Sequence, residues 1–299
     1  MTLRPIRPGD VIGLVAPGSP FDRGRFDLAC DLLVRQGYRV RIGEHAFEAK
    51  GYVAGSESAR ASDLARAVLD PEIAAVVCIR GGYGSGCLLP WMPFPRLRDR
   101  MKPLVGYSDA TFLHLAFHAE LGWTTFHGPN LMDVADDSGA ARSLLEALEG
   151  ARDFVFHFSE EQILESGVAS GKVMGGNLTC LVHLMGTPYF PDFEGNILFL
   201  EDCNEKLYRL DRCINQLRLG RVFDGLAGMI LGRFKDCGDE SEVHSVISHH
   251  LKPFRFPVVA GLPFGHVAEN QVLPLGLRFS LNTYENTLAA LESPFSAVS

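Results

Sequence analysis

Short strand-like runs that alternate with stretches of helical spacing constrain the fold of this chain more than any other feature. The runs lie at 11–15, 38–42, 73–79 and 103–107, and the helical stretches at 22–36, 57–69 and 109–120. Residues 73–79 are apolar at every position, and such a strand is normally covered by helices on both sides of a parallel sheet. Gly37 and Asp70-Pro71 stand where two helices should end. This alternation predicts a doubly wound, mostly parallel α/β domain over residues 1–155.

The chain beyond residue 173 predicts a second, smaller domain of mixed α/β structure at 173–299. Gly175-Gly176-Asn177 starts a helical run, residues 208–219 form a further helix, and short apolar runs predict strands at 197–200, 226–232, 257–260 and 275–279. Residues 156–172 carry few strong signals and are expected to link the two domains. A length of 299 residues is also what two domains of ordinary size need.

Charge, cysteine content and hydropathy exclude several classes of protein. The net charge of -8, from 36 acidic and 28 basic residues, argues against a nucleic-acid partner. The 7 cysteines form no C-x-x-C pair and are typical of reduced, buried thiols. No apolar stretch approaches the ~20 residues of a membrane span, and the N-terminus lacks the apolar core of a signal peptide. We therefore expect a cytoplasmic protein without a membrane or nucleic-acid partner.

The sharpest local motif is Gly106-Tyr107-Ser108-Asp109-Ala110, where a buried strand meets a helix. A hydrolase nucleophile sits on such a turn, with small neighbours that let the backbone bend and expose the hydroxyl. The helix start would also supply free N–H groups to a developing oxyanion. Ser108 or Asp109 could instead be an ordinary helix cap.

A glycine-rich loop follows the strand at 73–79, over residues 80–86. Glycines there allow positive φ angles and let a ligand oxygen approach backbone N–H groups. The loop does not fit the dinucleotide pattern G-x-G-x-x-G, because Cys87 stands where the last glycine should be, and the Walker A pattern is absent as well. The loop therefore predicts oxyanion donors, and no nucleotide cofactor.

Two further features could complete a nucleophilic site. Glu201 and Asp202 close an apolar strand, at the end where α/β ligand sites gather, and His266 follows a later strand in a loop. A serine needs a neutral imidazole to take its proton, and a carboxylate must orient that imidazole. Ser108, Glu201 and His266 supply these roles in chain order, although Asp202 could serve in place of Glu201. Only a site between the two domains could unite them.

The histidine pair His114 and His118 has the spacing of half a zinc site. Leu115 replaces the glutamate of the H-E-x-x-H motif, and the intervening residues are apolar. We therefore expect no metal site.

Six motifs in chain order give the sequence a family resemblance. They are Val15-Ala16-Pro17-Gly18-Ser19-Pro20, Arg80-Gly81-Gly82-Tyr83-Gly84, Gly106-Tyr107-Ser108-Asp109, Gly175-Gly176-Asn177-Leu178, Leu200-Glu201-Asp202-Cys203-Asn204-Glu205 and Gly265-His266. Together they resemble the LD-carboxypeptidases, serine peptidases of the muramoyltetrapeptide carboxypeptidase group. The match runs over almost the whole chain.

The resemblance implies roles for individual residues. Ser108 would be the nucleophile, His266 the general base and Glu201 its orienting acid. The backbone N–H groups of Asp109 and Gly82 would form the oxyanion hole. It also implies a homodimer, no metal and no cofactor.

The same resemblance implies release of terminal D-Ala from peptidoglycan tetrapeptides during cell-wall recycling. A carboxypeptidase must recognise a free carboxylate, and the candidate substrate contacts are Arg80 with the adjoining Gly81, Asn177 and Arg209. Two alternatives stay open. One is a self-immunity peptidase that cleaves microcin C-type antibiotics, which would need an aromatic side chain to stack adenine. The other is a protein that binds a peptide without cleaving it.

Overall fold

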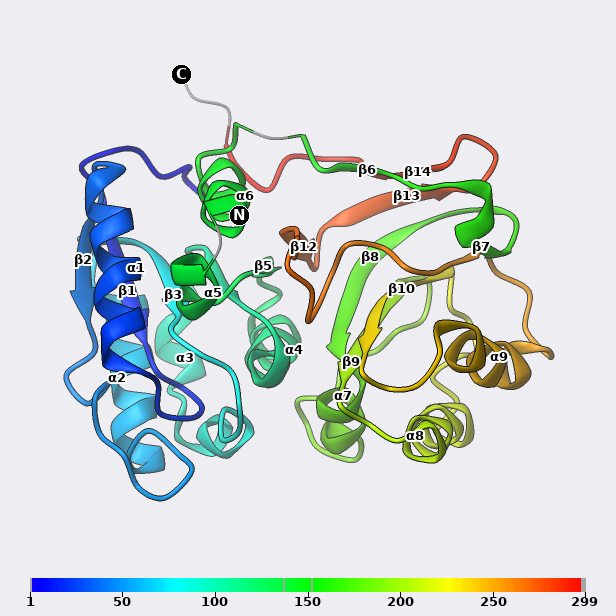
Figure 1. Cartoon of the computed structure of the whole chain (residues 1–299), viewed down its shortest axis with the longest axis horizontal. Coiled ribbons are helices and arrows are strands. Elements are labelled where there is room, and N and C mark those ends of the chain that lie inside the picture. Colours follow the sequence, from blue (N-terminus) through cyan, green and yellow to red (C-terminus); the bar gives the residue numbers. More distant parts are fainter. Residues whose placement is uncertain (1, 137, 152, 297–299) are drawn as a thin grey trace.

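The computed structural model describes residues 2–136, 138–151 and 153–296, and two β-sheets organise them (Figure 1). Five strands of the first sheet come from the N-terminal half and one, β12, comes from the C-terminal half, which also supplies every strand of the second sheet. Both sheets carry helices, so the predicted α/β class is confirmed. Within the described ranges, no helix is long and apolar enough to cross a bilayer.

The first sheet has six strands in the order β12-β5-β4-β3-β1-β2. They are β1 (Val11–Val15), β2 (Arg39–Ile42), β3 (Ile73–Cys78), β4 (Leu104–Gly106), β5 (Thr125–His127) and β12 (Leu273–Leu275). Strands β1 to β5 pair in parallel, and β12 pairs antiparallel with β5. The doubly wound, mostly parallel sheet is thus as predicted.

Helices cover both faces of this sheet. They are α1 (Arg23–Arg35), α2 (Glu57–Leu69), η1 (Gly86–Trp91), α3 (Phe94–Leu97), η2 (Ser108–Ala110), α4 (Thr111–Leu121), α5 (Leu131–Asp136) and α6 (Ser138–Leu148). Successive residues of β1 point to opposite faces: Ile12 shares a core with Phe26 of α1, and Val11 shares the other core with Leu64 of α2. This two-sided burial explains why β1, β3 and β4 lack a polar face, whereas β2 at the edge of the sheet exposes Arg39 and Arg41.

The second sheet has eight strands in the order β6-β14-β13-β8-β9-β10-β11-β7. They are β6 (Val155–His157), β7 (Ile163–Glu165), β8 (Val168–Asn177), β9 (Ile197–Cys203), β10 (Gly228–Lys235), β11 (Val258–Val259), β13 (Arg278–Asn282) and β14 (Thr287–Ala290). Strands β8 to β11 are parallel, and the outer pairs are antiparallel. Leu198 of β9 packs in one core with Leu210 of a helix, and Phe199 packs in the other with Phe279 of β13.

The remaining helices accompany this sheet: η3 (Glu160–Gln162), α7 (Leu178–Leu184), α8 (Leu207–Leu219) and α9 (Glu240–Leu251). Figure 1 shows α7 and α8 below the strands of this sheet and α9 to their right. The Asn177 side chain caps α7 by accepting a hydrogen bond from the Cys180 N–H at 3.1 Å. The predicted helical run after Gly175-Gly176-Asn177 therefore begins at the end of β8.

The expected single strand at 275–279 is wrong. Gly276 has a φ of 83°, and a Cβ there would lie 2.8 Å from His118 Nδ1 and 2.9 Å from the Trp123 carbonyl oxygen. The chain therefore turns at this glycine, so that β12 joins the first sheet and β13 joins the second. Apolar residues flank this turn on both sides, so the sequence pattern indicates one continuous strand.

The stretch 156–172, expected as a linker, contains β7 and the first residues of β8, both in the second sheet. The domain limits at residues 155 and 173 stay a prediction.

Candidate active site

Ser108 lies in a strained turn between β4 and α4. Its φ of 63° is in the left-handed region, which costs a residue with a side chain about 1–3 kcal/mol. Gly106 leaves room for the turn, because a Cβ there would lie 2.9 Å from the Ala110 Cβ and 3.0 Å from the Cys78 Cβ. Ser108 is half-buried and lines a cavity of about 620 Å³. The geometry is that of a nucleophile elbow.

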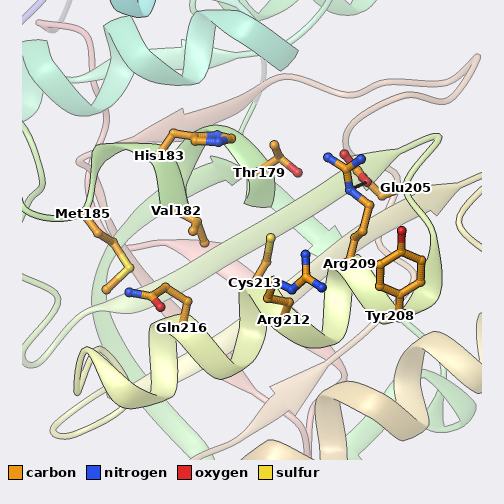
Figure 2. A pocket seen from close by; sticks show the side chains of 10 residues that line it. All are labelled: Thr179, Val182, His183, Met185, Glu205, Tyr208, Arg209, Arg212, Cys213 and Gln216. Carbon is orange, nitrogen blue, oxygen red and sulfur yellow. Dashed lines mark ion pairs between the residues drawn. The ribbon is translucent and has the colours of Figure 1, made fainter.

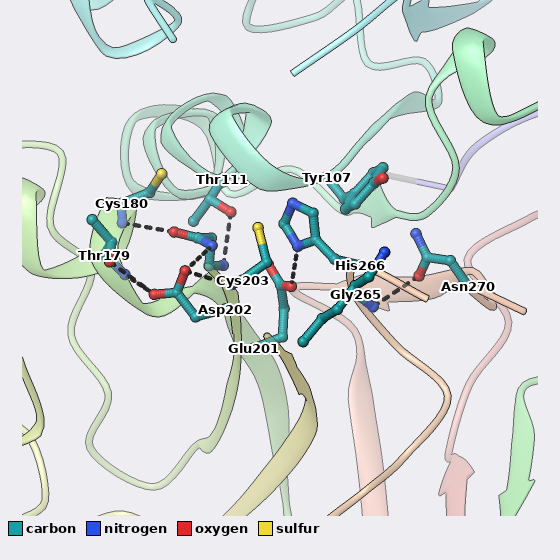
Figure 3. Close-up of polar contacts among 12 residues, drawn as sticks. Tyr107, Thr111, Thr179, Cys180, Glu201, Asp202, Cys203, Gly265, His266 and Asn270 are labelled. Atoms are coloured by element: carbon teal, nitrogen blue, oxygen red, sulfur yellow. Dashed lines mark hydrogen bonds and ion pairs between the residues drawn. The ribbon is translucent and has the colours of Figure 1, made fainter. Parts of the chain in front are cut away.

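His266 and Glu201 are joined by a hydrogen bond (Figure 3). The distance from His266 Nδ1 to Glu201 Oε2 is 2.7 Å. Glu201 ends the apolar part of β9 and its side chain is fully buried, whereas His266 comes from the loop after β11. Gly265 has a φ of 101°, and a Cβ there would collide with the Glu201 carboxylate, so only glycine permits this approach. Asn270 Oδ1 holds the loop by accepting a bond from the Gly265 N–H at 2.9 Å.

The surroundings of His266 favour its protonated form. Burial lowers the pKa of its imidazole, but hydrogen bonds with Cys203 and Glu201, together with the charge of the Glu201 carboxylate, outweigh burial and raise the pKa above its usual value of 6.5. One oxygen of Glu201, Oε1, is buried without a hydrogen-bond partner in the described part of the chain. The carboxylate therefore acts mainly on the imidazole.

Tyr107 brings the imidazole next to the serine turn. Its ring centroid lies 4.9 Å from that of His266, and it immediately precedes Ser108. Nearby, Thr111 Oγ1 of α4 accepts a hydrogen bond at 2.9 Å from the backbone N–H of Asn177. Asn177 in turn pairs in register with Glu201 across β8 and β9. These contacts join the serine turn to the second sheet.

The glycine loop lies directly against the serine. A Cβ on Gly81 would lie 3.1 Å from the Ser108 Cβ and 3.3 Å from its Oγ. Gly82 has a φ of 92° and lines the same cavity as Ser108 and Asp109. Asp109 Oδ2 accepts a bond from the Ser85 N–H at 2.7 Å, which fixes the loop. Burial raises the pKa of Asp109, although bonds from Ser85 oppose this shift.

Asp202, the alternative to Glu201, forms hydrogen bonds with residues other than His266. Its carboxylate accepts hydrogen bonds from Asn177 Nδ2 at 2.9 Å, Thr179 N at 3.0 Å, Thr179 Oγ1 at 2.8 Å and Cys203 N at 2.8 Å (Figure 3). Asn177 lines the cavity, but both ends of its amide are used, one for Asp202 and the other for Cys180. The geometry makes Glu201, and not Asp202, the partner of the imidazole.

Neither arginine candidate for a substrate contact lines the cavity that holds Ser108. Arg80 Nη1 donates to the Pro20 carbonyl oxygen at 2.6 Å on the exposed side of the loop. Arg209 pairs with Glu205 at 2.7 Å and lines a neighbouring cavity.

The histidine pair on α4 is structural in character. His114 Nε2 donates to the Gly106 carbonyl oxygen at 2.8 Å, and burial lowers the pKa of His114 to about 4. His118 Nδ1 lies 3.2 Å from the Trp123 carbonyl oxygen. Across the described ranges, no group of three or more His, Cys, Asp and Glu side chains is placed to hold a metal ion.

Several residues that shape the site were given no role from the sequence, although Tyr107 lies within the motif around Ser108. Asn270 and Tyr107 act through contacts that arise only in the fold. Arg60 is buried in α2 and donates to the carbonyl oxygens of Pro17 and Gly84, which joins the glycine loop to the loop after β1. Its apolar neighbours in α2, Ala59 and Ala61, could have hinted at burial, but an arginine on a helix is ordinarily a surface residue.

Comparison with known proteins shows which family this chain resembles. The model of the LD-carboxypeptidase N-terminal domain matches residues 12–128, and that of the LD-carboxypeptidase C-terminal domain matches residues 170–281. A probable murein peptide carboxypeptidase of Bacillus subtilis (strain 168) is 33% identical over 298 residues, which covers 96% of this chain and 93% of the relative.

Solved structures agree over nearly the whole chain. The structure of MccF in complex with glutamyl sulfamoyl guanosine has a TM-score of 0.91 at 25% identity and covers 99% of both chains. A muramoyltetrapeptide carboxypeptidase from Oxalobacter formigenes has a TM-score of 0.85 at 28% identity and covers 95% of this chain and 99% of its own. This chain therefore belongs to the LD-carboxypeptidase family.

Proposed function

We propose that this protein is a serine-type LD-carboxypeptidase that releases terminal D-Ala from murein tetrapeptides. The observation that carries the proposal is a serine on a strained turn that lines a cavity, while Tyr107 of the same turn contacts an imidazole that is hydrogen-bonded to a buried carboxylate. The Bacillus subtilis relative and the Oxalobacter formigenes structure are named for murein peptide and muramoyltetrapeptide cleavage, which supports a murein peptide as substrate.

In the proposed reaction, Ser108 Oγ attacks the carbonyl carbon of the L,D-peptide bond. His266 Nε2 accepts the hydroxyl proton, while its Nδ1–H donates to Glu201 Oε2 and so keeps the imidazole in the correct tautomer. His266 then returns the proton to the leaving amine of D-Ala. Water then attacks the acyl group on Ser108 while His266 accepts a proton from that water. His266 passes the proton to Ser108 Oγ as the ester bond breaks, which releases the acid product.

The oxyanion would be bound by the backbone N–H groups of Gly82 and Asp109. The position of Gly81 against Ser108 and the anchoring of the loop by Asp109 support this assignment. Such preorganised donors typically contribute about 2.7–4 kcal/mol each to the stability of the transition state.

A second candidate is cleavage of an antibiotic that joins a peptide to a nucleotide. The high structural similarity to MccF supports it, and Tyr83, Phe112 and Tyr189 line the cavity where a base could stack. Neither tryptophan lines that cavity: Trp123 is buried in the core and Trp91 is on the surface. We favour the murein peptide, and further propose that the enzyme works as a cytoplasmic homodimer.

The test combines a substrate panel with one substitution. Mass spectrometry should detect D-Ala release from an L,D-linked tetrapeptide and none from a D,D-linked one, and Ser108→Ala should abolish release. A serine-directed reagent should label the native protein at Ser108. Full turnover by Ser108→Ala would refute the serine mechanism. If the native protein binds the peptide without cleaving it, a non-catalytic binding protein is favoured. If it prefers an aminoacyl sulfamoyl nucleoside, the second candidate is favoured.

A further inference from the structure

A second cavity of about 430 Å³ lies between α7 and α8, next to the one that holds Ser108 (Figure 2). The two cavities share three lining residues, Thr179, His183 and Glu205. The two cavities therefore adjoin, and a peptide bound at Ser108 would have the second cavity as its neighbour.

The two cavities differ in charge. The Ser108 cavity is lined by three carboxylate residues, Asp109, Asp202 and Glu205, and no lysine or arginine is among the described residues that line it. The second cavity contains two arginines of α8, Arg209 and Arg212. Positive charge thus begins where the Ser108 cavity ends.

The guanidinium groups of Arg209 and Arg212 differ in whether they form an ion pair. Arg209 Nε pairs with Glu205 Oε2 at 2.7 Å. Arg212 lies with its guanidinium carbon 5.6 Å from the centroid of the Tyr208 ring, and no carboxylate of the described chain is within ion-pair distance of it. Contact with an aromatic ring restrains the guanidinium while leaving its N–H donors free. Two arginines facing one glutamate leave one positive charge to be matched.

Murein stem peptides carry carboxylates besides the terminal one. The isoglutamyl residue has a free α-carboxylate, and a diaminopimelyl side chain has another, whereas a lysyl side chain has none. A guanidinium binds a carboxylate through charge-assisted, frequently bidentate hydrogen bonds. We propose that the second cavity is a subsite for a carboxylate on the acyl part of the bound peptide, with Arg212 as its donor and Arg209 as its neighbour; this inference rests on the proposed function.

Steady-state kinetics of Arg212→Gln on three tetrapeptides would test this. The first peptide has a free isoglutamyl carboxylate and a lysyl side chain. The second has an amidated isoglutamyl group and a diaminopimelyl side chain. The third has an amidated isoglutamyl group and a lysyl side chain, so that only its terminal carboxylate remains. Arg218→Gln is the matched control, because Arg218 is an exposed residue of the same helix that bonds to Asn215, outside the cavity.

For the first or the second peptide, Arg212→Gln should raise KM about tenfold, equivalent to about 1.4 kcal/mol, with kcat within about twofold of the wild type. The peptide affected identifies which carboxylate is bound. For the third peptide KM should not change, and Arg218→Gln should match the wild type throughout. Equal effects on all three peptides, or no effect on any, would overturn the subsite. Absence of D-Ala release by the wild type would instead refute the proposed function.

Discussion

Replacement of Glu201 by glutamine tests the proposed chemistry most directly. The side chain keeps its shape, but it loses the charge that faces His266 Nδ1 across 2.7 Å. An amide can donate its N–H to the imidazole and so stabilise the wrong tautomer. Because Glu201 is fully buried, no water can take over the role of the carboxylate. We expect the fold to persist while kcat falls by a factor of about 10⁴, which corresponds to about 5.5 kcal/mol of transition-state stabilisation.

The pH dependence gives the same variant a second readout. Catalysis needs the neutral imidazole, and the pKa of His266 is raised in the native protein, so kcat/KM should rise with pH through a pKa above 6.5. In Glu201→Gln the carboxylate charge is gone and burial opposes protonation of His266, so the rise of kcat/KM with pH should occur at lower pH. A raised histidine pKa also stabilises the fold below pH 6.5, and that contribution is lost as pH rises through the folded-state pKa.

Initial rates of D-Ala release over pH 5 to 10, with urea unfolding beside them, would measure both effects. Asp202→Asn is the matched control. Asp202 accepts hydrogen bonds from Asn177 and Thr179, so its loss should lower the free energy of unfolding by about 1–3 kcal/mol and spare the pH profile. The reasoning would be refuted if Glu201→Gln kept its rate and profile while Asp202→Asn lost activity.

Three further substitutions test the surroundings of the site. Ser108→Gly should be more stable to urea than Ser108→Ala by about 1 kcal/mol, because only glycine relieves the φ of 63°; equal midpoints would contradict the strain. Gly82→Ala would bring a Cβ into collision with the Ser19 side chain and displace the loop. We therefore expect kcat to fall about 10²–10³-fold with an unchanged circular dichroism spectrum. An unaltered kcat would show that Gly82 is not part of the oxyanion hole. Asn270→Ala leaves the Gly265 N–H without its buried partner and should cost about 1–3 kcal/mol in urea unfolding together with a lower kcat; wild-type stability and rate would show that the loop does not need this anchor.

Local signals in the sequence were enough to predict most of the elements. The apolar run at 73–79 became β3, and the helical stretches at 57–69 and 109–120 became α2 and, after the short η2 turn, α4. Prediction failed at Gly276, because the crowding by His118 and Trp123 that admits only glycine at this turn comes from residues far away in the chain. Short-range patterns carry no information about such contacts.

The same division applies to the candidate site. The sequence by itself determined which side chains are chemically able to act: a serine on a strand-to-helix turn, a glycine loop after a buried strand, and an acid and a histidine near the ends of later strands. Only the tertiary structure decided that Glu201, and not Asp202, faces His266, and that Arg80 donates to the Pro20 carbonyl oxygen and does not line the cavity. The physical reason is that neighbouring residues on a strand point to opposite faces, so one residue of register decides which carboxylate meets the imidazole.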